Sequence, residues 1–301
     1  MSNSLLIRPV KAGDAGMLYD FASRVEAGLT TLRPDQKYIE ERIQRSIASF
    51  SDQSVMDPLY VFILQIAETP RVLGTCSITP KTLGVTSGYY YQQQILPLDS
   101  QWPPNRTIGI LAPYRETSLG TELGGLYLTS EMRHKGAGRL LSLSRMFFIA
   151  MYPERFDANI FAELRGVTGA DSSPPFWRDV ASHFIGGTFH AFQSSIKGYS
   201  IDSQALAPFP IFIPLLPFET QMAIGAPHPH AEGARRLLKD IGLEFSGLVD
   251  CTDAGPRYSA DMRELYSHKK FYRRRVKVIR HVEGENTLMI APFSSPYRLS
   301  A

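Results

Sequence analysis

Cysteine is scarce in this sequence. Its 301 residues include two cysteines, Cys76 and Cys251, which lie far apart and fit no metal-ligand spacing. We therefore predict no metal site, and we expect both residues to be reduced, packed thiols of a cytoplasmic protein.

Long apolar runs are also missing, and the charge is nearly balanced. No apolar stretch approaches the roughly 18–20 residues that a membrane-spanning helix needs. The N-terminus lacks a basic region followed by a sustained apolar core, so it predicts a first β-strand rather than a signal peptide. The net charge of +3 is too small to indicate nucleic-acid binding by itself. The hydrophobic fraction of 44% is that of a globular protein, with a core for one large or two small α/β domains.

Glycine and positive charge are concentrated in residues 122–142. An apolar strand leads into a basic turn, and the turn opens into an amphipathic helix, an arrangement that offers backbone N–H groups to a phosphate. Gly136 and Gly138 allow the main chain to approach the ligand closely or to take a positive φ. The charges suited to a pyrophosphate belong to Arg133, His134, Lys135 and Arg139. Taken alone, the segment is also compatible with an ordinary polar loop between a strand and a helix.

The apolar periodicity of the first 187 residues predicts a particular order of elements. A strand, two helices and a two-stranded hairpin come first, followed by residues 83–119, which we interpret as strand fragments and an elaborated loop. The remaining elements are, in order, a strand, the glycine-containing loop, a helix, a strand and a helix. The predicted strands are 5–10, 59–67, 72–79, 123–128 and 159–164, and the predicted helices begin near 14, 38, 138 and 175.

Residues 188–262 predict a second αβ region, and 263–301 a basic C-terminal extension. The second region contains a proline-bracketed apolar strand at 208–217, a helix at 231–241 ended by Gly242, and a strand at 244–250. We interpret it as a degenerate copy of the first domain that contributes to the active site. The basic and aromatic residues of 263–281 suit nucleic acid or an acidic surface, but a solvated terminal element is the favoured interpretation.

The spacing Arg-x-x-Gly-x-Gly between a strand and a helix resembles the acyl-coenzyme A loop of the GCN5-related N-acetyltransferase superfamily. The order of the predicted elements is also that of this fold. The resemblance implies an α+β, acetyltransferase-like fold, with a mixed central sheet flanked by helices. It implies cofactor contacts from Leu126, Leu128, Arg133, His134, Lys135, Gly136, Ala137, Gly138 and Arg139.

A set of short segments in a fixed order carries a closer resemblance, to the bacterial arginine N-succinyltransferase family. It implies transfer of a succinyl group from succinyl-CoA to the α-amino group of L-arginine, in a homo-oligomer, with a donor contact at Leu126 and a catalytic histidine at His228. The segments are Ile7–Val10, Gly28–Leu32, Glu122–Leu123, Leu126–Leu128, Gly138–Arg145, Ala162–Val167, Pro175–Trp177, Pro214–Pro217, Ala223–Pro229 and Asp253–Pro256.

The chemistry of acyl transfer agrees with a histidine in this place. An amine that attacks a thioester must lose a proton and the departing thiolate gains one, which suits an imidazole. His228 lies between two prolines, whose restricted backbone would hold the ring in place, and His230 is its competitor. A guanidinium needs a carboxylate and an α-carboxylate needs a cation. Glu163 and Arg165 are the candidates, with a structural ion pair as the alternative.

Several departures from the family leave the acceptor open. Gly124 and Gly125 replace a Cys-Thr pair, and residues 112–115 and 186–206 differ from the family pattern. The alternatives are therefore a transferase acting on ornithine, another amine or a protein lysine, and an inactive fold that serves as a binding module. No cysteine occupies a nucleophile position, which favours direct attack in a ternary complex over an acyl-enzyme.

Overall fold

The computed structural model describes residues 5–24, 32–52, 55–67, 69–84, 88–99, 102, 104–133, 136–194, 206–265 and 299–300. His134, Lys135 and most of the predicted basic extension lie outside these residues, as does most of the predicted turn at 28–32.

One mixed sheet of eleven strands runs through the described part of the chain. Its order is β11-β1-β2-β3-β6-β7-β10-β9-β4-β5-β8, and the described pairs are antiparallel except for β6 with β7. The strands are β1 Leu5–Pro9, β2 Tyr60–Ile66, β3 Val72–Thr82, β4 Tyr89–Pro97, β5 Thr107–Arg115, β6 Gly120–Leu128, β7 Asn159–Glu163, β8 Ile211–Phe212, β9 Glu244–Asp250, β10 Pro256–Asp261 and β11 Leu299–Ser300.

Helices cover both faces of the N-terminal half of this sheet. Successive residues of a strand point to opposite faces, and β2 shows the result. Its Phe62 packs in the core that contains α3, whereas Val61 and Ile63 pack against α1 and α2. The helices are α1 Ala15–Arg24, α2 Gln36–Ser51, α3 Ala137–Met151, α4 Ser182–Ile185, α5 Phe189–Ser194, α6 Phe218–Ala223 and α7 Glu232–Ile241.

The helix boundaries follow local sequence signals. The Asp35 carboxylate accepts a hydrogen bond from the Tyr38 N–H (3.0 Å) and caps α2. Ile39 and Ile43, one turn apart, are both buried against the sheet. Gly242 ends α7 with φ of +101°, which a glycine adopts without strain. These predicted elements are therefore confirmed, with shifts of a few residues at their ends.

Two sequence predictions were wrong. Residues 83–119 contain a long regular hairpin, in which β4 and β5 pair continuously from Tyr89–Arg115 to Pro97–Thr107. Pro97 ends β4, and Pro113 lies in β5 beyond the two residues that pair with β8, where a missing N–H is tolerated. Conversely, the predicted strand at 208–217 contains only the two residues of β8, because its closely spaced prolines cannot donate to a ladder.

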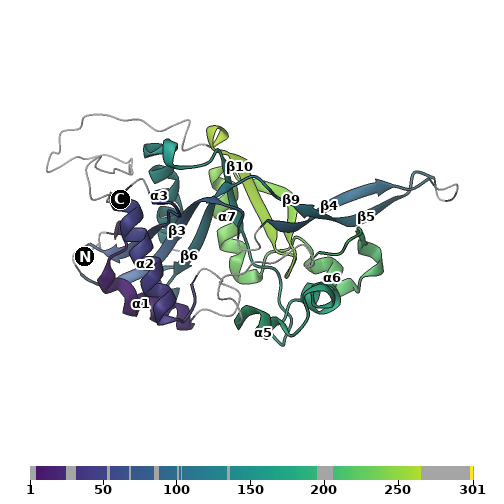
Figure 1. Cartoon of the computed structure of the whole chain (residues 1–301), viewed down its shortest axis with the longest axis horizontal. Helices are drawn as coiled ribbons and strands as arrows, with labels where there is room; N and C mark the ends of the chain where they lie inside the picture. Colours follow the sequence, from purple (N-terminus) through teal and green to yellow (C-terminus); the bar gives the residue numbers. More distant parts are fainter. Residues whose placement is uncertain are drawn as a thin grey trace.

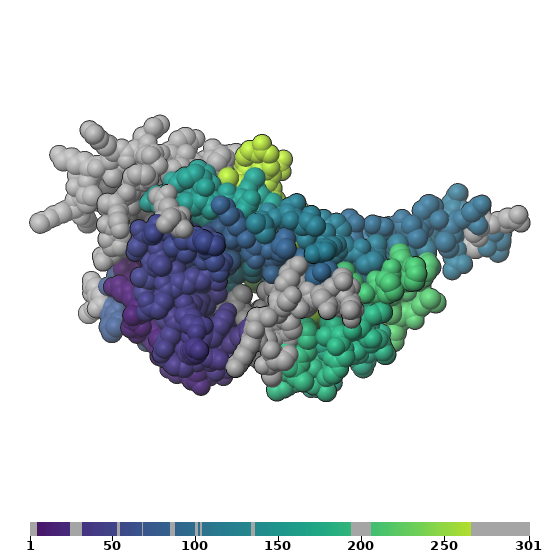
Figure 2. All heavy atoms as spheres, viewed as in Figure 1, coloured from purple at the N-terminus to yellow at the C-terminus, as the bar shows by residue number. Residues whose placement is uncertain are grey.

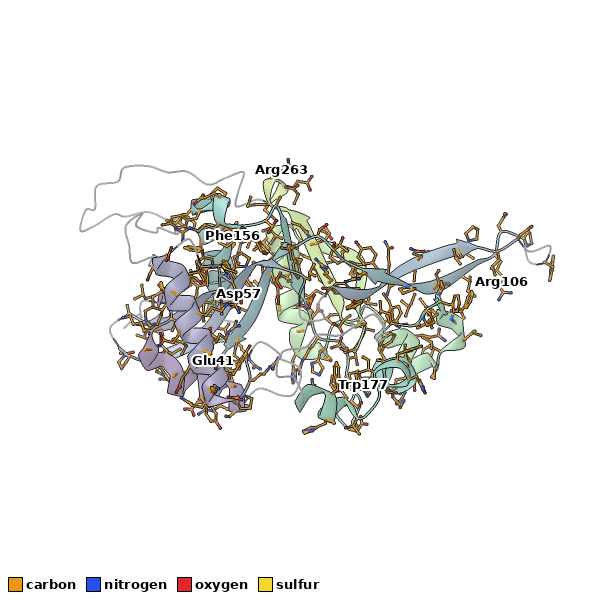
Figure 3. All side chains as sticks on the ribbon, viewed as in Figure 1. Glu41, Asp57, Arg106, Phe156, Trp177 and Arg263 are labelled. Atoms are coloured by element: carbon orange, nitrogen blue, oxygen red, sulfur yellow. The ribbon has the colours of Figure 1, made fainter. Side chains whose placement is uncertain are left out.

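The molecule has two helical lobes and a projecting arm. The α1–α2 pair covers the N-terminal end of the sheet, and the β4–β5 hairpin extends from the other end (Figure 1). Trp177 packs on Phe189 of α5, while Arg106 lies near the hairpin tip (Figure 3). The α1–α2 lobe and the lobe that holds α5 and α6 lie on the same side of the molecule, and the hairpin projects beyond them (Figure 2).

The predicted domain boundary near residue 187 does not interrupt the sheet. Strands β9 and β10 belong to the predicted second region, and they join β4 and β7 of the first. The division into a donor domain and a second region remains a prediction. The two regions meet at β7 and β10, which brings the candidate residues of both together.

Candidate active site

The parallel strands β6 and β7 pair only at their beginnings. The register contains Thr121 with Ile160 and Glu122 with Phe161. Beyond this point, residues 123–128 have no described strand partner on the β7 side, so an edge of backbone N–H and C=O groups opens there. Leu126 and Leu128 lie on this edge and are half-buried. An extended ligand with amide groups can therefore pair with β6 as an added strand would.

A β-bulge lies in β6 beside this edge. Thr75 pairs with Tyr127 and Ser77 with Gly124, so β6 contains one more residue than β3 over this interval. Gly125 takes φ of +60° there, a conformation that favours glycine. Gly124 and Gly125, which replace the family's Cys-Thr pair, thus lie at the bulge, where β6 bends beside its open edge.

The basic loop ends at the N-terminus of α3. Gly136 is the N-cap with φ of +77°, and the N–H groups of the first turn follow it. These N–H groups have no partners within the helix, and with the helix dipole they attract an anion. Arg133 and Arg139 are exposed at this end, whereas Ala137 is buried and contributes only its backbone.

Gly138 is required for close packing at the same place. A Cβ atom there would lie 3.1 Å from Cδ1 of Leu128 and 3.6 Å from Cδ1 of Leu237. The glycine therefore lets α3 approach the end of β6 and α7. Gly138 was predicted to allow close approach of the main chain to a ligand or a positive φ; its φ is not positive, and the approach to a ligand stays a prediction.

His228 and Arg165, predicted separately, are in direct contact. Arg165 follows β7, and an isolated bridge between Gly166 and Pro227 aligns the two segments. The His228 N–H donates to the Arg165 carbonyl (2.9 Å), and Nη2 of Arg165 lies 2.9 Å from Nδ1 of His228. The backbone N–H of His230 also donates to Nδ1 (3.1 Å). Since a guanidinium only donates, Nδ1 is the acceptor and the ring proton lies on Nε2.

Glu163, at the end of β7, belongs to a buried cluster of carboxyl groups. It is hydrogen-bonded to the hydroxyl of Tyr90. Burial, together with the nearby carboxyl groups of Glu122 and Asp250, raises the pKa of Glu163 to about 8. The same burial raises the pKa of Glu122 and of Asp250 above their ordinary values. At neutral pH Glu163 therefore holds a proton until a cation compensates its charge.

Arg257 is a cation beside Glu163. It pairs with Glu163 in the β10–β7 register, and its side chain is 2% exposed. The guanidinium stacks on the rings of Phe161 (4.0 Å) and Tyr90 (4.9 Å). Its Nη1 has no hydrogen-bond partner among the described residues. The positive charge of Arg257 thus lies close to the carboxyl groups, and its Nη1 makes no hydrogen bond to any of them.

Asp253 fixes the loop that supports Arg165 and His228. Its carboxylate accepts hydrogen bonds from the N–H of Gly166 (2.8 Å) and of Gly255 (2.7 Å). Burial and the neighbouring Asp250 raise its pKa to about 7. The short segment Asp253–Pro256, one of those that carried the family resemblance, therefore has a structural role beside the site.

Sequence reasoning did not select Tyr90, Glu122, Asp250 or Arg257 as site residues. Tyr90 and Asp250 face one another in the β4–β9 register, far from each other in the sequence. The available signal was weak, since Glu122 lay at the start of the glycine motif and Asp250 at the end of a predicted strand. Only strand pairing brings them to Glu163.

The model of the arginine N-succinyltransferase beta subunit family matches residues 5–267 of this chain. The chain belongs to this family. It is therefore an enzyme of the acyltransferase class, and its fold is the α+β acetyltransferase-like fold that the sequence predicted.

Named relatives agree with this assignment. The chain is 27% identical over 271 residues to arginine N-succinyltransferase of Enterobacter sp. (strain 638), covering 88% of this chain and 78% of that protein. It is 28% identical to arginine N-succinyltransferase of Escherichia coli O17:K52:H18, with the same coverage. The arginine/ornithine succinyltransferase subunit AI from Pseudomonas aeruginosa has a similar structure, with a TM-score of 0.83 and 22% identity over 99% of this chain and 88% of that one.

The described residues give two further findings. They contain no helix that is both long and apolar enough to span a membrane. They also contain no group of three or more His, Cys, Asp and Glu side chains arranged to hold a metal ion.

Proposed function

We propose that this enzyme transfers a succinyl group from succinyl-CoA to the α-amino group of L-arginine, in arginine catabolism. The open edge of β6 carries the proposal, because it leads directly to the N-terminus of α3 in a chain of this family. We also propose that the enzyme acts in the cytoplasm as a homo-oligomer, with two reduced cysteines.

The donor would lie along β6 and end at α3. Its pantetheine amides would pair with the backbone near Leu126 and Leu128, as in strand addition. The pyrophosphate would accept hydrogen bonds from the first-turn N–H groups after Gly136 and from Arg133 and Arg139, where charge-assisted bonds are strong. His134 and Lys135 retain their predicted part in this contact.

The reaction would proceed by direct attack of the amine on the thioester. The amine nitrogen forms a bond to the carbonyl carbon, the C–S bond breaks, and the proton that the nitrogen loses ends on the departing thiolate. His228 would support this transfer through a hydrogen bond from its Nε2–H to the sulfur, since two donors hold Nδ1. Cys76 and Cys251 are fully buried, and burial raises the pKa of the Cys76 thiol to about 11, so neither thiol suits an acyl-enzyme.

The acceptor would be bound by opposite charges at its two ends. Glu163, whose pKa is raised by burial, would pair with the guanidinium and lose its proton in doing so. Arg165 would bind the α-carboxylate, and its contact with His228 would bring the α-amine close to that ring. Both roles agree with the types of partner that each group prefers.

A panel of amines tests the proposed function. Thiol release from succinyl-CoA is measured with arginine, ornithine, spermidine, a lysine peptide and no acceptor. We expect arginine to give the highest kcat/KM. If another amine supported thiol release and arginine did not, arginine would not be the acceptor. If no CoA compound raised the melting temperature in a thermal-shift assay, the binding-module alternative would be favoured. Ornithine is the second candidate acceptor, because the similar Pseudomonas aeruginosa protein is named for both amino acids.

Replacing Arg133 and Arg139 by glutamine tests the donor site. Both are exposed, so folding should be unaffected, and the double variant should raise the KM for succinyl-CoA by about tenfold or more. The turnover of succinyl-pantetheine, which lacks the pyrophosphate, should not change. Arg106→Gln, near the tip of the hairpin, is the matched control (Figure 3). An equal loss with both donors would contradict a pyrophosphate contact.

A further inference from the structure

A cavity lies between the α1–α2 pair and the sheet. Leu18 of α1 and Ile39 and Ile43 of α2 supply apolar walls. The other lining groups include Arg42 of α2, the hydroxyls of Thr75 and Ser77 and the thiol of Cys76 on β3, and Gly125 of β6. The cavity has a volume of about 10 Å³, which is space for about one water molecule, and it reaches the bulged strand.

Gly125 connects the cavity to the proposed donor site. It is the residue of positive φ in the β6 bulge, immediately before Leu126 on the open edge. Ser77 pairs with Gly124 across the β3–β6 ladder. A donor whose thioester lies beside this bulge therefore has the cavity next to its acyl group.

The guanidinium of Arg42 retains donors for a ligand. Its Nη2 donates to Oγ of Ser77 (2.8 Å), which uses one of five N–H donors. No other hydrogen bond of this side chain, and no ion pair with Glu122, joins it to the residues that the structure describes. Ser77 thus orients the guanidinium while most of its donors remain available.

We propose that Arg42, whose side chain lines this cavity together with Gly125, binds the distal carboxylate of the donor's succinyl group. The inference rests on the proposed use of succinyl-CoA. The two methylenes would pass Gly125, which has no side chain, and a terminal carboxylate needs a cation at their end. Arg42 would thereby distinguish a dicarboxylic acyl group from a neutral one of the same length.

The position of Glu122 agrees with this role. Arg42 and Arg257 both attract its charge, but burial has the largest effect and raises the pKa of Glu122 above its ordinary value. Burial thus favours the neutral carboxylic acid, which does not compete for the guanidinium. A bound succinyl carboxylate would supply the anion that Arg42 lacks.

Donor discrimination tests the inference. Succinyl-, butyryl- and acetyl-CoA are compared with arginine as acceptor, because butyryl has the length of succinyl without the carboxylate. Arg42→Gln should lower the ratio of kcat/KM for succinyl-CoA over butyryl-CoA by about 10- to 100-fold, and its turnover of butyryl-CoA shows that it is folded. Arg45→Gln, on the same helix but paired with Asp57 at 2.5 Å, should change the ratio less than about twofold.

The outcomes separate the two proposals. If the wild-type enzyme does not use succinyl-CoA with any amine, the proposed function fails. If the wild-type enzyme uses succinyl-CoA and Arg42→Gln keeps its ratio, only the role of Arg42 is overturned. If Arg42→Gln does not fold, Arg42→Lys decides: lysine has a shorter reach and no planar fork, so the ratio should fall about 3- to 10-fold, and an unchanged ratio overturns the inference.

Discussion

Replacing His228 by alanine is expected to lower kcat by about 10²- to 10³-fold, and to leave the KM for succinyl-CoA within about threefold. The reason is local. Arg165 and the His230 N–H both donate to Nδ1, so Nε2 carries a proton that would hydrogen-bond to the leaving sulfur while the thiolate takes up the proton lost by the amine. Loss of the ring removes this hydrogen bond but none of the groups proposed to bind the donor. The effect should therefore appear in the chemical step.

Steady-state kinetics with arginine and succinyl-CoA measure this change, and a donor with a less basic leaving group sharpens the result. A thioester of an aromatic thiol releases a thiolate that hardly needs a proton, so His228→Ala should recover most of its turnover with it. His230→Ala is the matched control, because the backbone N–H that contacts Nδ1 is kept. If His228→Ala kept a near-wild-type kcat, His228 would have no part in the mechanism.

The strand, loop and helix of the proposed donor site could be predicted from sequence, because their signals are local. Gly136 was expected to allow a positive φ or a close approach, and it has φ of +77° at the start of α3. A strand, a glycine loop and a helix are consecutive in the chain, so their relative position follows from short-range geometry. The bulge at Gly125 was not foreseen, because it depends on the register with β3.

The residues proposed to bind the acceptor could not be predicted in the same way. The buried groups around them come from β4, β6, β7, β9 and β10, and their proximity depends on which strands pair. Tyr90 lay in a segment interpreted as strand fragments and an elaborated loop, because the tyrosines, prolines and glycines of residues 83–119 obscured the alternation of a hairpin. Arg257 carried no motif at all. Its position became evident only when β10 paired with β7 and placed it opposite Glu163.

Glu163→Gln is expected to lower kcat/KM for arginine by about 100-fold, and to lower that for citrulline far less. Citrulline has the shape of arginine and the same α-amine, but its side chain is neutral. The ratio of kcat/KM for arginine over citrulline therefore isolates the contact with the guanidinium. Tyr90→Phe is the matched control, since it removes the hydrogen bond to Glu163 and keeps the carboxyl group.

The same ratio should depend on pH in the wild-type enzyme. Burial raises the pKa of Glu163 from 4.5 to about 8, so below that pH the site holds a proton that a guanidinium must displace. The arginine-to-citrulline ratio should rise with pH and level off above about 8, and the shared α-amine cancels from it. In Glu163→Gln the ratio should be flat. A rising ratio in that variant would assign the titration to another group, such as Asp250.

Stability provides a second measurement that needs no substrate. Between pH 4.5 and about 8 the folded state holds the Glu163 proton and the unfolded state does not. Because the folded state binds more protons there, its stability should fall as pH rises through this window, by up to about 1.4 kcal/mol per pH unit. Glu163→Gln should remove this part of the slope and should be the more stable protein above pH 8. If denaturant unfolding gave the same slope for both proteins, Glu163 would be ionised in the empty site, and arginine would bind without releasing a proton from it.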